Sequence, residues 1–219
     1  MELVLLLVQM ILLFFLTRRS INELFFLFTY LTHDKKSAST IIAMLFFPGT
    51  AIHEMAHFLM ATALLQRVHS IHIFPELHGH ALKLGKVLYE KKDFLRGILV
   101  GVAPLLAGLF FLWFVATTIS SIETTVIRYG LFFYLTFVIS STMFSSKQDL
   151  IDLVYIVPVL LLISAIVYVF NIPIQHYAIL LLSMLEPSLQ IVNRFVFYSL
   201  VVHCILIGGI FLLKPILPR

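Results

Sequence analysis

The chain has 219 residues, of which 61% are hydrophobic and 12% are charged. This excludes a disordered chain and an ordinary soluble domain, because a soluble fold cannot hide so much apolar surface. The net charge of +4 does not indicate a nucleic-acid partner, since Lys and Arg also collect in the cytoplasmic loops of membrane proteins. We therefore expect an all-α polytopic membrane protein that lies in a lipid bilayer, with about six transmembrane helices of about 20 residues each.

Charge-free stretches mark the predicted helices, because the hydrocarbon core of a bilayer excludes Asp, Glu, Lys and Arg. The first stretch has neither a basic region before it nor a small-residue cleavage site after it, so we interpret it as a helix and not as a removable signal. The predicted spanning helices cover about residues 2–17, 41–66, 95–118, 125–144, 150–170 and 188–212. Residues 20–32 and 173–186 are apolar but too short to span, and they predict an interfacial or re-entrant piece and a partial helix.

The one substantial polar loop covers residues 67–93, and it predicts a β-hairpin. Two short runs of β-favouring residues, 68–74 and 81–89, flank a turn that contains Gly79. The loop also holds four histidines, namely His69, His72, His78 and His80. No carboxylate pattern completes them except Glu76, which disfavours a second metal site. We expect the loop to be structural or to hold substrate, since an exposed strand edge can pair with an unwound peptide.

One short motif inside the apolar run 41–66 carries chemistry. It reads HEMAH from His53 to His57, and positions four apart lie on one face of a helix. His53 and His57 can therefore bind one Zn²⁺ ion together, while Glu54 beside them acts as general base toward zinc-activated water. Zinc needs neutral imidazoles about 2.0–2.1 Å away and an open position for water, whose pKa it lowers to about 7.

The membrane setting of this motif favours a zinc site over a structural cluster of hydrogen bonds. In a chain of this length and composition about 0.01 matches to the motif are expected by chance, and the motif has a known mechanism. An ionisable group at the centre of a spanning helix costs about 2.5–3.5 kcal/mol on insertion scales. Glu54, flanked by two histidines, should not persist there for packing alone.

Zinc needs a third protein ligand, usually His, Asp or Glu, and the sequence offers three main candidates. Asp149 follows the polar segment 145–148, which separates two apolar runs. Irregular backbone at membrane depth is tolerated where protein or a water-filled cavity surrounds it, so this segment suits a buried metal site. The alternative is an interfacial loop in which Asp149 caps a helix. Asp152 lies three residues further on nearly the same helical face, Glu186 is the remaining candidate, and we predict Asp149.

The zinc motif and several neighbouring segments resemble a known family. The resemblance extends from about Phe47 to Asp152 and is to the site-2 protease family of intramembrane zinc metalloproteases. Within that family the chain is similar to the small bacterial members that lack a PDZ domain. The matching motifs are PGTAIHEMAH (48–57), LGKV (84–87), GVAP (101–104) with Gly108 following, and SSKQD (145–149).

This resemblance implies a zinc-dependent endopeptidase that cuts membrane-embedded protein substrates. It implies that His53 and His57 are zinc ligands and that Glu54 is the catalytic base. The family usually takes its third ligand from an Asp-Gly motif on a later helix. This chain contains no Asp-Gly, and Asp149 matches the family ligand by order and context only.

We therefore expect one transmembrane metallopeptidase domain over residues 1–219. It contains the zinc-motif helix at about 41–66, the hairpin loop at about 67–93 and the third-ligand segment at about 145–152. The expected substrate is a transmembrane helix of another membrane protein, which must unwind locally before its peptide bonds become accessible.

The alternative is a non-catalytic membrane protein that binds or transports a metal ion. A transporter predicts paired half-helices and inverted repeats, and the sequence shows neither. No Asn-X-Ser/Thr sequon occurs, which is consistent with the predicted location in a bacterial cytoplasmic membrane.

Overall fold

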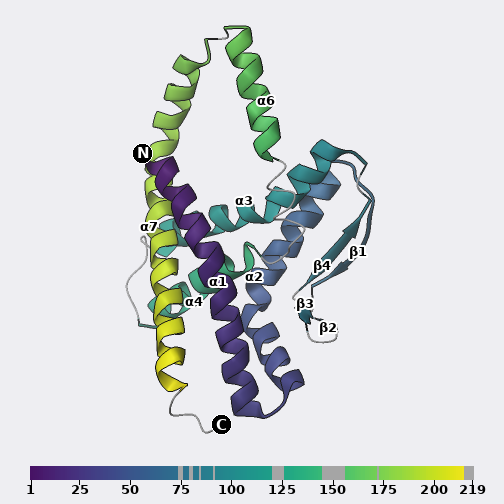
Figure 1. Ribbon diagram of the computed structural model, residues 1–219, viewed down its shortest axis with the longest axis vertical. Coiled ribbons are helices and arrows are strands. Elements are labelled where there is room, and N and C mark those ends of the chain that lie inside the picture. The colour runs from purple at the N-terminus through teal and green to yellow at the C-terminus, as the bar shows by residue number, and fades with distance from the viewer. Residues whose placement is uncertain are drawn as a thin grey trace.

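The computed structural model is helical along most of the chain (Figure 1), and it describes residues 1–73, 76–78, 81–83, 85–90, 92–119, 126–144, 156–171 and 173–214. The described helices are α1 (Glu2–Thr32), α2 (Lys35–Ala63), α3 (Phe94–Ile119), α4 (Val126–Thr142), α6 (Ile156–Val169) and α7 (Gln175–Leu213). The strands are β1 (Val68–His72), β2 (Glu76–His78), β3 (Ala81–Lys83) and β4 (Lys86–Tyr89). The expected all-α class with a small β-hairpin is confirmed.

Four of the described helices, α1, α2, α3 and α7, are long and apolar enough to cross a membrane. α1 has 31 residues and α7 has 39. At 1.5 Å per residue they are about 46 and 58 Å long, against about 30 Å for the hydrocarbon core of a bilayer. α4 and α6 are apolar but shorter, with 17 and 14 residues. The expectation of about six transmembrane helices stays a prediction.

Two pairs of segments that were predicted as separate pieces are each one continuous helix. Residues 2–17 and 20–32 both belong to α1, and residues 173–186 and 188–212 both belong, from Gln175 onward, to α7. The charges between the first pair interrupt the apolar run but not the helix, because Arg has a high helix propensity. Proline within α7 removes one backbone hydrogen bond, and an apolar setting keeps the remaining backbone bonds formed.

Two polar contacts join α1 to α7, the most extensively packed pair of described helices. Near the start of α1, the Asn193 side-chain amide donates to the Glu2 carbonyl oxygen at 3.0 Å and to the Glu2 carboxylate at 2.6 Å. Near the end of α7, Lys214 contacts the buried carboxylate of Glu23 at 2.7 Å, and Arg19 contacts it at 2.7 Å as well. Glu2 and Glu23 lie about 32 Å apart along α1, which is close to the thickness of the hydrocarbon core.

A buried network of hydroxyl groups and one histidine lies between these two polar levels and joins α1, α4 and α7. The His203 side chain on α7 is 0% exposed. Its Nδ1 lies 2.7 Å from the hydroxyl of Ser20 on α1, and its Nε2 lies 3.4 Å from the hydroxyl of Ser141 on α4. Beside it, the Ser199 hydroxyl donates to the Ser140 hydroxyl. Such interhelical hydrogen bonds hold helices together in apolar surroundings.

We expect His203→Ala to lower the stability of the folded protein by about 1–3 kcal/mol, because it leaves the buried Ser20 hydroxyl without its histidine partner. The unfolding midpoint of the detergent-solubilised protein measures this. Cys204→Ala is the matched control, since Cys204 is the next residue and is exposed. An unchanged midpoint in His203→Ala would show that the network does not stabilise the bundle.

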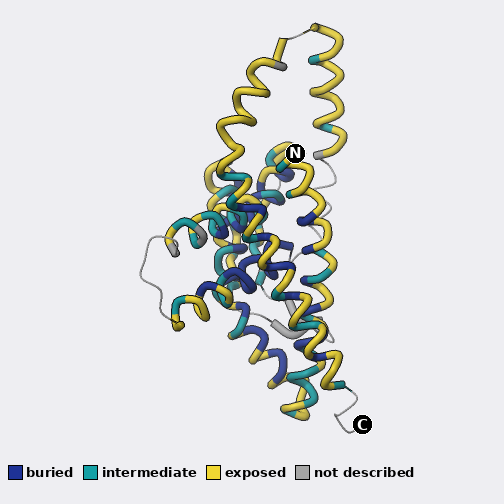
Figure 2. Tube along the Cα trace, turned by 90° about the vertical axis from the view of Figure 1, so that its left-hand side faces the viewer, coloured by how far each residue is buried: buried dark blue, intermediate teal, exposed yellow. Residues whose placement is uncertain are grey.

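α6 and the first part of α7 extend beyond the rest of the bundle as two apolar arms (Figure 1). Within the described chain, α6 makes almost no contact with other elements, and Figure 2 shows both arms as almost entirely exposed. Their exposed large side chains include Leu160, Leu161, Ile163, Tyr168, Ile179, Leu181 and Met184. An apolar surface of this extent requires a cover of lipid or of protein.

The predicted hairpin is confirmed as two short antiparallel strand pairs. β1 pairs with β4, with Ile71 opposite Val87, and β2 pairs with β3, with Leu77 opposite Leu82. The β1–β4 register shifts once, between Val68 and Ser70. Both β1 and β4 contact α2, and the hairpin runs back along that helix instead of extending away from it (Figure 1).

Candidate metal centre

The helix that carries the motif begins earlier than predicted, because Asp34 caps it. The Asp34 carboxylate accepts hydrogen bonds from the backbone N–H groups of Ser37 at 2.8 Å and Lys36 at 3.2 Å. These bonds, led by that from the Ser37 backbone, hold the pKa of Asp34 below its ordinary value. The capping contribution is therefore present above the ordinary pKa of Asp and is lost as the pH falls through the lowered pKa.

His53 and His57 lie one turn apart on α2, with their rings nearly perpendicular and their centroids 4.8 Å apart. Their side chains are buried, at 3% and 7% exposure, and their Nε2 atoms are 3.2 Å apart. Two nitrogens that bind one tetrahedral zinc ion at about 2.0–2.1 Å are about 3.3–3.4 Å apart. The observed separation therefore fits a shared metal ion with almost no movement. It also permits a direct hydrogen bond between the rings.

A backbone group of α3 fixes which nitrogen of His57 can bind a metal. His57 Nδ1 lies 2.9 Å from the carbonyl oxygen of Val100. A carbonyl oxygen only accepts hydrogen bonds, so Nδ1 is the protonated nitrogen and Nε2 of the neutral ring keeps its lone pair. Metal-binding histidines usually donate their other ring N–H to such a carbonyl or carboxylate. The arrangement around His57 therefore suits a zinc ligand.

A glycine one turn before the motif lets α4 pack closely against α2. A Cβ atom at Gly49 would lie 2.5 Å from the Thr142 hydroxyl and 2.7 Å from the Val138 carbonyl oxygen. On this side of His53 the described side chains leave no space for a water molecule; they are Ile52, Pro104, Ile139, Thr142 and Met143. The close packing holds the backbone of the motif in a fixed position beside α3 and α4.

The hairpin brings Gly85 directly against the Glu54 carboxylate. Glu54 is buried, at 4% exposure, and a Cβ atom at Gly85 would lie 2.6 Å from its Oε1 and 2.7 Å from its Cγ. From Glu54 to Leu64 at the end of α2 the helix rises about 15 Å, and from Gly85 to Glu90 the strand rises about 17 Å. These nearly equal distances place Gly85 at the depth of the motif.

Three hydrogen bonds join the two ends of the hairpin loop where they meet at the end of α2. The Glu90 N–H donates to the Arg67 carbonyl at 2.9 Å. Lys92 donates to the Leu65 carbonyl at 2.7 Å, and Arg96 donates to the carbonyl of the residue before it, Leu64, at 3.1 Å. Basic side chains at these carbonyl groups also complement the negative end of the helix dipole.

The structure brings His53 and His57 together and buries Glu54 beside Gly85, but it does not test the third ligand. Asp149 and Asp152, with the whole segment 145–152, lie outside the described residues. Glu186 is described on α7 and is exposed. Within the described ranges, no group of three or more His, Cys, Asp or Glu side chains is placed to hold a metal. Glu186 therefore does not complete the histidine pair.

Asp149 remains the predicted ligand, and we expect its removal to weaken zinc binding strongly. We expect Asp149→Ala to weaken zinc binding more than about 100-fold, beyond the range for the loss of a supporting residue, and Asp152→Ala to have little effect. Competition with a zinc chelator measures both affinities. The reverse pattern would assign the ligand to Asp152, and full affinity in both variants and in the double variant would exclude this segment.

The loop histidines do not join the centre in the part that the structure describes. His69 and His72 are exposed, and His80 lies outside the described residues. Two groups that do contact the motif, the Val100 carbonyl and Gly85, were not predicted as site residues. The sequence signals for them were GVAP, which follows Val100 directly, and LGKV, which contains Gly85.

Comparisons with known proteins add no relative to this description. No protein-family model matches the chain, and neither a curated protein nor a solved structure matches it. The function proposed for the centre therefore rests on its own residues and geometry and on the resemblance of its motifs to the site-2 protease family.

Proposed function

We propose that this protein is an intramembrane zinc endopeptidase, as its resemblance to the site-2 protease family implies. The observation that carries the proposal is the geometry of the histidine pair. The two Nε2 atoms lie 3.2 Å apart, and the Val100 carbonyl holds His57 in the tautomer that a metal requires. A structural pair of hydrogen-bonded histidines would not need the neighbouring carboxylate of Glu54.

In this proposal, His53, His57 and Asp149 hold the zinc ion, which when bound would supply a Lewis acid that activates water and polarises the scissile carbonyl. Glu54 takes a proton from the attacking water and passes it to the leaving amine. Confinement of the Glu54 carboxylate beside Gly85 favours this role, because proton transfer requires a fixed geometry. The residues of the hairpin loop, 67–93, hold the unwound substrate segment by strand pairing.

The proposal places the chain as a multi-pass protein in a bacterial cytoplasmic membrane. Four described helices long and apolar enough to cross a membrane support a membrane location. Six spans require α4 and α6 in addition. α4, with 17 residues, reaches the lower limit for a spanning helix. The substrate is a transmembrane helix of another membrane protein.

Metal analysis of the purified protein tests the proposal most directly. We expect one zinc ion per chain in the parent protein and none in His53→Ala or His57→Ala, because two ligands bind zinc too weakly to survive purification. His33→Ala is the matched control, since His33 lies between α1 and α2, outside the motif, and it should retain zinc.

Two results would contradict the metal centre. One is zinc that remains in both motif variants, which would place the metal elsewhere. The other is a parent protein that neither contains zinc nor binds it when it is supplied, in which case the two rings bond directly to each other.

A further inference from the structure

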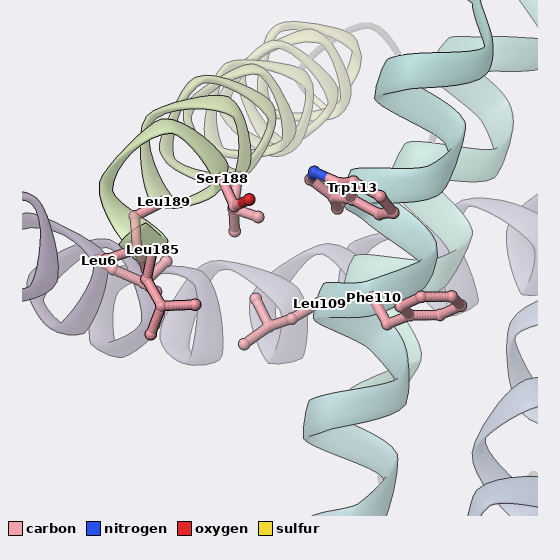
Figure 3. A pocket seen from close by; sticks show the side chains of 8 residues that line it. Leu6, Leu109, Phe110, Trp113, Leu185, Ser188 and Leu189 are labelled. Carbon is pink, nitrogen blue, oxygen red and sulfur yellow. The ribbon is translucent and has the colours of Figure 1, made fainter. Parts of the chain in front are cut away.

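A cavity lined by none of the motif residues lies between α1, α3 and α7 (Figure 3). Its volume is about 230 Å³. Eight side chains line it, namely Leu6, Leu109, Phe110, Trp113, Leu185, Ser188, Leu189 and Val192. Six of the eight are aliphatic or phenyl groups, and Phe110 and Leu185 continue onto the exposed apolar surface. The cavity is therefore apolar and opens toward the surroundings of the bundle.

Two polar groups interrupt this lining and lie opposite each other. The indole nitrogen of Trp113 is buried and has no hydrogen-bond partner among the described residues. Figure 3 shows that this nitrogen and the Ser188 hydroxyl point toward one another across the cavity. A buried indole N–H ordinarily finds an acceptor, and leaving one without an acceptor is destabilising. The cavity therefore suits a ligand with an apolar body and one hydrogen-bond acceptor.

The position of the cavity along the bundle indicates where such a ligand comes from. Leu6 lies one turn after Glu2, and Val192 is adjacent to Asn193. Glu2 and Asn193 form the polar contact at the start of α1, one of the two levels that lie about one hydrocarbon thickness apart. Along α1, Leu6 lies about 6 Å on the inner side of the Glu2–Asn193 level, and along α7, Ser188 lies about 8 Å on its outer side. In a bilayer placed between the two levels, the cavity therefore spans the interface, where tryptophan is enriched.

We propose that this cavity binds one acyl chain of a membrane lipid, whose ester carbonyl accepts hydrogen bonds from the Trp113 indole N–H and the Ser188 hydroxyl. Ester carbonyls lie at the interface, which is the level that the cavity spans, and the apolar lining around the two polar groups suits an acyl chain. A transmembrane helix fits less well, because it is about 10–12 Å wide and its carbonyl groups are already bonded within the helix. The inference rests on the proposed membrane location but not on peptidase activity.

Trp113 is the only tryptophan of the chain, so its intrinsic fluorescence reports on the cavity directly. The full-length protein in detergent is titrated with a phosphatidylcholine that carries bromine, a fluorescence quencher, on its acyl chains. We expect quenching that saturates at a low ratio of lipid to protein. In Ser188→Phe and in Leu6→Phe, which fill the cavity from two different helices, we expect quenching at the same ratio to be several-fold weaker and not to saturate.

The matched control is Leu182→Phe, which adds the same side chain to an exposed position of α7 outside the cavity, and it should behave like the parent protein. Saturable quenching that both filling variants retain would overturn the proposal, as would weak, unsaturated quenching in every form, which indicates surface lipid only. Reversal of the quenching by a synthetic transmembrane peptide, but not by unlabelled phosphatidylcholine, would assign the cavity to a helix instead.

Zinc content separates this test from the test of the metal centre. We expect both filling variants to retain the zinc content of the parent protein, because the cavity and the motif share no residue. A protein without zinc that still shows saturable quenching would refute the peptidase and leave the lipid site in place. Loss of zinc in one filling variant would show that its fold is disturbed. The quenching of the other filling variant then decides whether the cavity binds the lipid.

Discussion

Glu54→Gln is expected to lower the rate of peptide-bond cleavage by about 10²–10⁴-fold, the range for loss of a general base. The amide has nearly the same shape as the carboxylate, but it cannot take up the proton of the attacking water. Because His53 and His57 keep their positions, the zinc content should equal that of the parent protein. Cleavage of a set of single-span model substrates by the detergent-solubilised protein measures the rate.

Glu186→Gln is the control for this variant, since it removes an exposed carboxylate from α7 and should leave the rate unchanged. Parental cleavage by Glu54→Gln would exclude Glu54 as the base, whatever the metal content. Zinc loss in Glu54→Gln would instead show that the glutamate supports the metal site and not the proton transfer.

Gly85→Ala is expected to lower the cleavage rate by about 100-fold, the effect of displacing a catalytic group by about 1 Å. The new methyl carbon would lie 2.6 Å from Glu54 Oε1 and 2.9 Å from its Cδ. Something must move, and the least costly movement is that of the flexible glutamate side chain. Zinc content should stay at the parental level, since the clash involves neither imidazole.

Gly130→Ala is the matched control, because a Cβ atom at Gly130 would meet no atom within 4 Å. A double-mutant cycle with Glu54→Asp adds a second check. The shorter aspartate leaves room for the methyl group, so Gly85→Ala should cost much less activity in that background. Equal losses in both backgrounds would show that Gly85 acts independently of Glu54.

The helices could be predicted in outline, but their ends could not. Apolar stretches report which residues tolerate the bilayer, whereas helix ends depend on capping and on backbone breaks. Arg18 and Arg19 end an apolar stretch and yet lie inside α1, while Asp34 begins α2 well before the apolar run. Charges between apolar stretches therefore indicate which residues lie within the membrane more reliably than they indicate where a helix begins or ends.

The candidate centre could be predicted where it is local in sequence. His53 and His57 follow from helical periodicity alone. The Val100 carbonyl and Gly85 reach the motif through tertiary packing, which no local pattern encodes. His203 was not predicted as a contact residue, although a histidine in a charge-free run is a signal for a polar partner inside the membrane.

The contact between Gly85 and Glu54 depends on two elements, α2 and β4, that advance by different distances per residue. One residue advances the helix by about 1.5 Å but the strand by about 3.3 Å. Deleting one residue from β4 would therefore move the hairpin by about two helical positions and would also turn the strand over, so that its other face met α2. We accordingly expect β4 to tolerate changes of side chain far more readily than changes of length.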